Sequence, residues 1–157
     1  MTRALITGSF DPPTLGHIDI IRRTASIFDE VVVCVCFNSQ KKGAFAPELR
    51  AEMLQASLED IPNVTVDRYD GLVADYAIAH QIDVIVKGVR NGADYDYEDT
   101  IAQVNLLNAP VETMFLPAAP QYRFVSSTVA REMIRFDRAL DKLLPVQVID
   151  LIRRESN

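Results

Sequence analysis

The sequence Gly-Ser-Phe-Asp-Pro-Pro-Thr-Leu-Gly-His at residues 8–17 connects a predicted strand to a predicted helix. The short apolar run at 4–7 that precedes it is typical of a central strand of a sheet. After it, apolar residues recur at helical spacing from Ile18 to Phe28 and form one stripe. The stretch therefore predicts a strand, a loop and a helix, in that order.

The residue types in this loop suit the binding of an anion. Gly8 lets the backbone turn or lets a ligand approach closely, and the two prolines fix φ and stiffen the loop. Thr14 is placed to cap the helix, and His17 falls in its first turn, where free N–H groups and the positive dipole end attract phosphate. Histidine can donate a hydrogen bond to a phosphoryl oxygen in its neutral or its cationic form. The alternative is a surface histidine at a helix start, and the combined motif favours the phosphate site.

Length and charge limit the possible functions. The chain has 157 residues, the size of one domain, so we expect a single domain spanning residues 1–157. Its net charge of −6 at pH 7 argues against nucleic acid or an anionic membrane as a partner. No apolar run approaches the ~18 residues of a membrane span, and the first residues lack a secretory signal, so a soluble cytoplasmic protein is expected.

The two cysteines indicate neither a metal site nor a redox site. Cys34 and Cys36 are two residues apart in a β-rich run, so both side chains should lie on the same face of one strand. This spacing matches neither a Cys-x-x-Cys redox motif nor a four-ligand zinc site. Buried, reduced thiols are expected.

Five apolar, β-rich runs alternate with helical patterns, which is typical of βαβ units. The predicted fold class is α/β, a Rossmann-like doubly wound five-stranded parallel sheet with helices on both faces. The strands are expected near Arg3–Thr7, Val31–Phe37, Val64–Arg68, Val84–Lys87 and Thr113–Leu116. After the helix that follows the first strand, helices are expected around 49–56, 73–78, 97–107, after 128 through about 135, and over 146–154. Residues 136–144 predict a short helix or a turn.

The unusual motifs all follow predicted strands. Residues 8–17 follow the first strand, Lys41 and Lys42 the second, residues 87–90 the fourth and residues 126–128 the fifth. In a doubly wound sheet, ligands bind beyond the carboxyl ends of the strands, where the strand order reverses. These motifs can therefore converge in one crevice. Because no Gly-x-Gly-x-x-Gly follows the first strand, a dinucleotide-dependent dehydrogenase is disfavoured.

Two groups of cations belong to these motifs. Lys41 and Lys42 lie in a polar loop, where a lysine pair is most often solvated surface, although a flexible ammonium can close over phosphates. Lys87 and Arg90 flank a glycine directly after an apolar strand, where buried cations need an anion. Phosphate is the favoured partner of this second pair. The alternative is ion pairing with nearby acidic residues, which are Asp94, Asp96, Glu98 and Asp99.

A run of three hydroxyls, Ser126, Ser127 and Thr128, stands at the start of a predicted helix. Ordinary capping needs only one of them. Together with the free N–H groups of a first helical turn, the three can surround a triphosphate. The segment is therefore a candidate nucleotide site, with capping as the alternative.

The pieces Gly-Ser-Phe-Asp-Pro and Thr-Leu-Gly-His resemble the paired signature of the nucleotidyltransferase superfamily. Within it, the chain resembles the bacterial phosphopantetheine adenylyltransferases nearly from end to end. The resemblance implies transfer of the adenylyl group of ATP to 4′-phosphopantetheine, giving 3′-dephospho-coenzyme A and pyrophosphate. It also implies Mg²⁺ bound mainly through the ATP phosphates, a homohexamer, and coenzyme A as a possible feedback ligand.

The same resemblance implies roles for individual residues. His17 would stabilise the transition state, and Lys41, rather than Lys42, would act with it. The residues implied to hold ATP are Ser9, Phe10, His17, Gly88, Val89, Arg90, Glu98, Arg123, Phe124, Val125, Ser126, Ser127, Thr128 and Val129. The residues implied to hold phosphopantetheine are Ser9, Lys41, Val73 and Lys87. No residue is implied to ligate the metal ion.

Two residues depart from the pattern of this family. Lys87 stands where the family often has arginine, which keeps the charge but loses bidentate phosphate binding. Thr128 replaces a common serine, and Ser-Ser-Thr-x-x-Arg also resembles the segment of nicotinate mononucleotide adenylyltransferases. An adenylyltransferase for that or another phosphomonoester therefore stays an alternative.

The expected reaction needs no general base. A phosphate monoester has its second pKa near ~6, so it is largely anionic at neutral pH. The site must align two anions in line and stabilise the charge that spreads over the α-phosphoryl oxygens. Histidine, lysine, arginine and helix N-termini suit this task. A nucleotide-binding regulatory module without turnover is the alternative from another class, and it leaves His17 among these cations unexplained.

Overall fold

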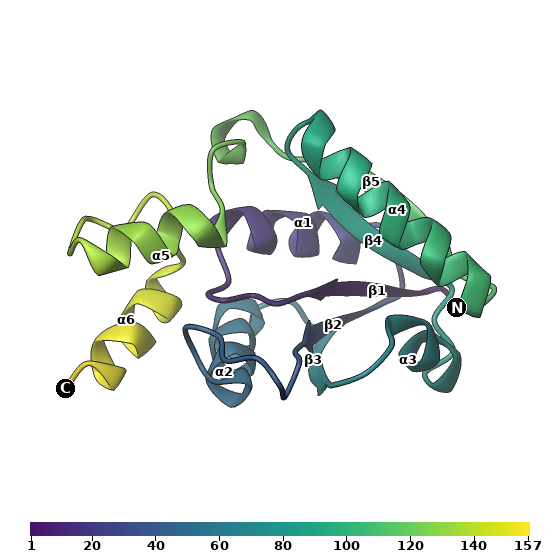
Figure 1. Ribbon diagram of the computed structural model, residues 1–157, viewed down its shortest axis with the longest axis horizontal. Helices are drawn as coiled ribbons and strands as arrows, with labels where there is room; N and C mark the ends of the chain where they lie inside the picture. The colour runs from purple at the N-terminus through teal and green to yellow at the C-terminus, as the bar shows by residue number, and fades with distance from the viewer.

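The computed structural model describes residues 1–157, in which strands and helices alternate (Figure 1). The strands are β1 (Arg3–Gly8), β2 (Glu30–Cys36), β3 (Val64–Tyr69), β4 (Val84–Val89) and β5 (Glu112–Pro117). The helices are α1 (Leu15–Ala25), α2 (Pro47–Leu58), α3 (Val73–Ala79), α4 (Gly92–Asn108), the 3₁₀ helix η1 (Pro120–Tyr122), α5 (Ser127–Arg135) and α6 (Val146–Glu155). All five predicted strands are present, with small shifts of their ends. No helix among these is long and apolar enough to cross a membrane.

The sheet is parallel throughout, with the strand order β3-β2-β1-β4-β5. The chain runs outward from β1 through β2 to β3, returns to the other side of β1, and continues through β4 to β5. Leu5 of β1 pairs with Val32 of β2 on one side and with Ile85 of β4 on the other. The order reverses between β1 and β4, so the doubly wound prediction is confirmed and a ligand crevice is expected at their carboxyl ends.

Alternate side chains of the central strands enter two different cores, as the period of a strand requires. In β1, Ala4 and Ile6 face a core closed by α1 and α2, whereas Leu5 faces a core closed by α3. Helix α4 packs beside α3 and against β4 and β5 (Figure 1). Cys34 and Cys36 are free thiols that share the face of Leu5, as their spacing predicted. The prediction of helices on both faces is confirmed.

The last part of the chain packs on α2 rather than on the sheet. Leu144 is fully buried in a third core that includes Met53 of α2 and the apolar face of α6. Residues 136–144 form turns rather than a helix, which decides between the two predicted options. The carbonyl of Leu143 accepts the N–H of Leu15 at 2.9 Å, so this segment also supports the start of α1.

Helix α4 begins earlier than its apolar residues indicate. The prediction placed its start near Tyr97, whereas the helix begins at Gly92. The side chain of Asn91 caps it by accepting the N–H of Asp94 at 2.9 Å. The first turn is polar, so hydrophobic spacing alone could not reveal it. This early turn places Asp94 at the ligand crevice.

Candidate active site

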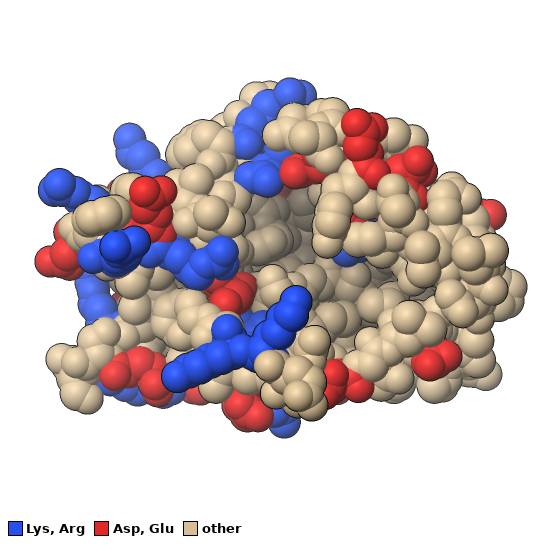
Figure 2. All heavy atoms as spheres, viewed as in Figure 1, with Lys and Arg blue, Asp and Glu red and all other residues tan.

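A cavity of about 620 Å³ opens at the carboxyl ends of β1 and β4, where the strand order reverses. Figure 2 shows this face of the molecule hollowed at its centre, with Lys and Arg side chains on the rim and acidic side chains beside them. The walls come from the loop after β1, the first turn of α1, the end of β4, the first half of α4, and the segment from η1 into α5. Residues from 8–17, 87–90 and 126–128 therefore meet in one crevice, as expected, whereas Lys41 and Lys42 of the fourth motif lie outside its lining.

Most of the residues predicted to hold ATP line this cavity. They are Ser9, Phe10, His17, Gly88, Arg90, Glu98, Val125, Ser126, Ser127 and Thr128. The lining does not include Val89, Arg123, Phe124 or Val129. Of the residues predicted to hold phosphopantetheine, Ser9 and Lys87 line the cavity, whereas Lys41 and Val73 lie outside its lining. The roles assigned to all these residues stay predictions.

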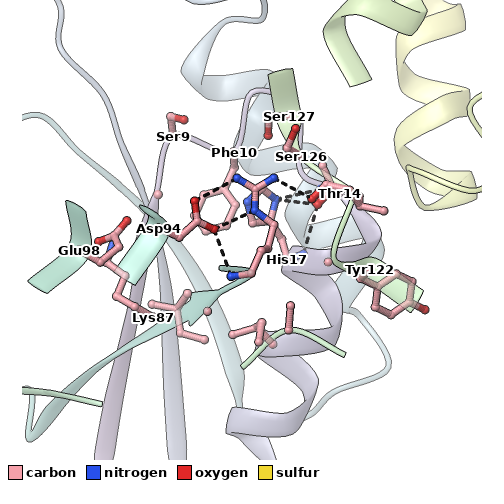
Figure 3. Close-up of a pocket in the computed structure, with 18 of the residues that line it drawn as sticks. Ser9, Phe10, Thr14, His17, Lys87, Asp94, Glu98, Tyr122, Ser126 and Ser127 are labelled. Carbon is pink, nitrogen blue, oxygen red and sulfur yellow. Dashed lines mark hydrogen bonds and ion pairs between the residues drawn. The ribbon is translucent and has the colours of Figure 1, made fainter. Parts of the chain in front are cut away.

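His17 is held in one orientation by the start of α1 (Figure 3). Its Nδ1 accepts the backbone N–H of Thr14 at 3.0 Å, while the hydroxyl of Thr14 accepts the N–H of His17 at 3.3 Å. The ring of Phe10 packs edge-on against the imidazole, with 4.9 Å between the ring centroids. Because Nδ1 accepts a hydrogen bond, the proton of the neutral ring is on Nε2. The imidazole therefore offers one N–H donor to a ligand.

The surroundings of His17 keep its ring neutral. Burial, together with the nearby charges of Arg90 and Lys87, lowers the pKa of His17 to about 4. At neutral pH the free site thus contains a neutral imidazole near two cations. A phosphoryl oxygen that gains negative charge at this position would receive a hydrogen bond without a proton transfer.

The floor of the cavity is shaped by close packing around Phe10. This residue has a φ of 50°, in the left-handed region, and its side chain is 2% exposed. A Cβ added at Gly8 would lie 3.2 Å from the Phe10 ring. On β4, a Cβ added at Gly88 would lie 2.7 Å from Cγ1 of Ile20 on α1. The glycine in β4 therefore allows the strand and α1 to approach each other beneath the site.

Both cations at the end of β4 pair with carboxylates of α4. Lys87 Nζ lies 3.2 Å from Glu98 Oε2, in an ion pair without hydrogen-bond geometry. Arg90 donates from Nε to Asp94 Oδ2 at 2.8 Å and from Nη2 to Oδ1 at 3.1 Å, which lowers the pKa of Asp94. Figure 3 shows Lys87 and Glu98 beside each other, with Asp94 nearby. The ion pairing that the sequence left as an alternative is therefore present, and all four side chains still line the cavity.

The three hydroxyls at the start of α5 each have a partner within the protein. Ser126 caps the helix by accepting the N–H of Val129 at 3.1 Å, which is the capping alternative. Ser127 donates to the carbonyl of Pro12 at 2.8 Å, and Thr128 Oγ1 accepts from Arg131 Nη2 at 3.3 Å. The segment lines the cavity at a helix N-terminus, so its dipole still favours an anion there.

Two charged residues of the lining were not among the predicted site residues. Arg131 reaches back from α5, where its Nη1 donates to the carbonyl of Asp11 at 2.7 Å. Asp94 was considered only as an ion-pair partner. A signal for Arg131 was in the sequence, because it follows Ser127 by four residues on a predicted helix, and residues at this spacing share a face. Asp94 had no such signal, because Arg90 precedes α4 and the two meet only through the turn at Asn91.

The sequence is similar to a known family and to named proteins over most of its length. A family model described as cytidylyltransferase-like matches residues 5–133, from β1 into α5. A phosphopantetheine adenylyltransferase from Thermobifida fusca (strain YX) is 42% identical over 153 residues, which cover 98% of this chain and 93% of the relative. A phosphopantetheine adenylyltransferase from Shouchella clausii (strain KSM-K16) is 39% identical over 154 residues, which cover 98% of this chain and 97% of the relative.

Proposed function

The chain belongs to the phosphopantetheine adenylyltransferases of the cytidylyltransferase-like family, and from this premise we propose that it transfers the adenylyl group of ATP to 4′-phosphopantetheine. The products are 3′-dephospho-coenzyme A and pyrophosphate, in coenzyme A biosynthesis. The observation that carries this proposal is the cavity lined by a neutral His17 together with the cations Lys87 and Arg90. We also propose that residues 1–157 act as one nucleotidyltransferase domain, since α6 packs back on α2.

The reaction is an in-line displacement at the α-phosphorus. An oxygen of the phosphopantetheine phosphate forms the new bond to the α-phosphorus, and the bond to the oxygen bridging the α- and β-phosphorus breaks. The electron pair of that bond leaves with pyrophosphate. Since the attacking phosphate is already anionic, no base is needed. His17 donates from Nε2 to a non-bridging α-phosphoryl oxygen, where negative charge increases in the transition state.

The ATP site is proposed along the walls formed by α1, the end of β4 and the start of α5. Arg90 would contact a phosphate with the guanidinium edge that Asp94 leaves free, because Asp94 uses Nε and Nη2. The predicted residues outside the lining each directly adjoin lining residues or one another, and they are Val89, Arg123, Phe124 and Val129. They would contact the nucleotide through small movements of these segments.

Phosphopantetheine is proposed to bind on the β2 side of the cavity. The side chain of Lys87 reaches from β4 toward that side, where its Nζ donates to the carbonyl of Thr7 at the end of β1 at 3.4 Å, and it would attract the phosphate. Lys41 follows β2, and Val73 is the first residue of the helix after β3, so both belong to carboxyl-end connections of the sheet. Lys41 is exposed and lies in a loop, from which its ammonium would reach the two phosphates during the reaction.

Magnesium is proposed to enter as part of the MgATP substrate. No group of three or more His, Cys, Asp or Glu side chains is placed to hold a metal ion. The two carboxylates in the lining, Asp94 and Glu98, already face Arg90 and Lys87. This donor set fits an ion that keeps phosphate oxygens and water as most of its ligands.

The test is pyrophosphate release by the purified protein with ATP and Mg²⁺, comparing two acceptors. Release with 4′-phosphopantetheine and not with nicotinate mononucleotide is expected, in line with the activity for which both relatives are named. Release with nicotinate mononucleotide alone would keep the mechanism and replace the acceptor. ATP binding without any release would indicate a regulatory module.

We propose that the protein is a homohexamer in the cytoplasm and that coenzyme A inhibits it, as the resemblance implies. An exposed apolar surface on α4 and β5 supports the oligomer. Leu107 of α4 is 84% exposed, and Val104 on the same helix and Met114 on the edge strand β5 are also exposed. Light scattering of the purified protein measures its mass, and Leu107→Lys is expected to shift it toward smaller species. Coenzyme A is expected to raise the apparent KM for phosphopantetheine.

A further inference from the structure

Asp11 connects the loop after β1 directly to the loop after β2. Its Oδ2 accepts the backbone N–H of Ala44 at 2.8 Å, and its Oδ1 accepts that of Phe45 at 2.9 Å. The residue is only 8% exposed, so these bonds form largely away from water. Both carboxylate oxygens therefore hold the backbone just before α2, in the loop that carries Lys41 (residues 37–46).

Arg50 completes this contact from the first turn of α2. It is 5% exposed, and its Nε lies 3.9 Å from Oδ1 of Asp11. The same Nε donates to the carbonyl of Phe45 at 2.9 Å, while Nη1 donates to the carbonyl of Ser9 at 2.8 Å. The buried pair of Asp11 and Arg50 thus contacts the backbone of two loops, the loop after β1 at Ser9 and the 37–46 loop next to α2.

The contact fixes one end of the 37–46 loop and leaves its tip exposed. A Cβ added at Gly43 would lie 2.8 Å from Oδ2 of Asp11, so the backbone touches the carboxylate at this residue. Lys41 is two residues earlier and exposed, and its backbone N–H donates to the carbonyl of Asn38 at 2.9 Å. Two residues span at most about 7 Å. The position of the fixed end therefore limits where the Lys41 ammonium can go.

We propose that Asp11, supported by Arg50, is a positioning residue that sets the distance between the loop of His17 and the loop of Lys41. This inference rests on the proposed role of Lys41 in adenylyl transfer. Asp11 does not act on the substrates itself. Asp11 keeps the 37–46 loop close enough for the Lys41 ammonium to reach the phosphates that His17 contacts. This position matters because misplacement by about 1 Å can cost about 100-fold in rate.

The test is a double-mutant cycle on kcat with Asp11→Asn, Lys41→Ala and the combined variant. The amide of Asn presents only one acceptor to the two N–H groups and leaves the Arg50 charge unbalanced. Asp11→Asn is expected to lower kcat about tenfold or more with little change in the ATP Kd. In the Lys41→Ala background the same change is expected to have almost no further effect on kcat.

Two further measurements separate positioning from a general loss of structure. Amide hydrogen exchange at Ala44 and Phe45 should be faster in Asp11→Asn than in the wild type. This measurement detects loss of the two hydrogen bonds to Asp11 independently of enzyme activity. If that variant is too unstable for assay, Gly43→Ala displaces the same contact while keeping the carboxylate, and it should show the same dependence on Lys41. Asp60→Asn is the control, since it removes an exposed carboxylate paired with Arg22 outside the cavity.

Losses in kcat that multiply in the double variant would overturn the proposal, as would an unchanged kcat in Lys41→Ala. A wild-type protein that releases no pyrophosphate would overturn the proposed function together with this inference. The two failures are distinguishable, because only the second affects the wild type.

Discussion

Nδ1 of His17 accepts the backbone N–H of Thr14 at 3.0 Å, so one bond of the capping box at the start of α1 also sets the tautomer of the imidazole. The neutral ring consequently carries its proton on Nε2, toward a ligand. His17→Ala is expected to lower kcat by about 100- to 1,000-fold, as loss of one transition-state donor does elsewhere. The Kd for ATP, measured by calorimetry, should change far less, because this hydrogen bond strengthens only as charge develops.

His17→Gln provides a sharper comparison with His17→Ala. The amide nitrogen of glutamine can replace Nε2 as a donor, so part of kcat should return. An ATP affinity that falls as much as kcat in His17→Ala would make His17 a binding residue only.

The lowered pKa of His17 predicts a pH dependence of stability. The folded-state pKa is about 4 and the ordinary value is 6.5, so between these values the unfolded chain binds a proton that the folded protein does not. The free energy of unfolding should therefore fall as the pH is lowered from 6.5 to 4, by up to about 3 kcal/mol from this residue. Urea unfolding of the wild type and of His17→Gln at pH 7 and pH 4.5 isolates this contribution, because the other titrating groups are shared. An equal pH dependence in the two proteins would contradict the prediction.

Asp94 is expected to orient Arg90 for a phosphate. Asp94→Asn keeps the size of the side chain but weakens the bidentate contact with Nε and Nη2. The KM for ATP should rise about tenfold, the effect of misplacing one charge-assisted hydrogen bond. Asp19→Asn is a matched control, since Asp19 pairs with Arg23, also four residues away, outside the cavity. An equal rise of the KM for ATP in both variants would show a general electrostatic effect.

Lys41 and Lys42 are neighbours in one exposed loop and differ only in their predicted role. Lys41→Ala is expected to lower kcat about 100-fold, because a cation that contacts the reacting phosphates is lost. Lys42→Ala changes the net charge equally and should leave kcat near the wild-type value. The reverse result would assign the role to Lys42.

Gly88 is predicted to be required for the packing of β4 on α1. Gly88→Ala places a methyl group 2.7 Å from Cγ1 of Ile20, whose side chain is 8% exposed and cannot move freely. The free energy of unfolding should fall by about 1–3 kcal/mol, the usual effect of overpacking. Gly92→Ala is the control, because a Cβ there meets nothing within 4 Å at the start of α4. Similar stabilities of the two variants would exclude this packing role.

The predictions that depended on local chemistry agree with the structure. Short apolar, β-rich runs indicated the strands, and the alternation of side chains along a strand separates Leu5 from Ala4 and Ile6 into two cores. Thr14 caps α1 as its residue type suggested, because the capping bond spans only three residues. The start of α4 was missed although the cap at Asn91 is equally local, because its first turn is polar and apolar spacing does not reveal it.

The sequence by itself determined the strands, the helices, the parallel doubly wound class and the grouping of motifs after the strands, because propensity, capping and periodicity act over a few neighbouring residues. Only the tertiary structure decided which charged groups meet. The contact of Asp11 with the loop of Lys41 joins residues more than thirty apart, and Arg131 returns to the Asp11 carbonyl from α5. Such contacts follow from how packed elements bring distant backbone together, and no local pattern specifies them.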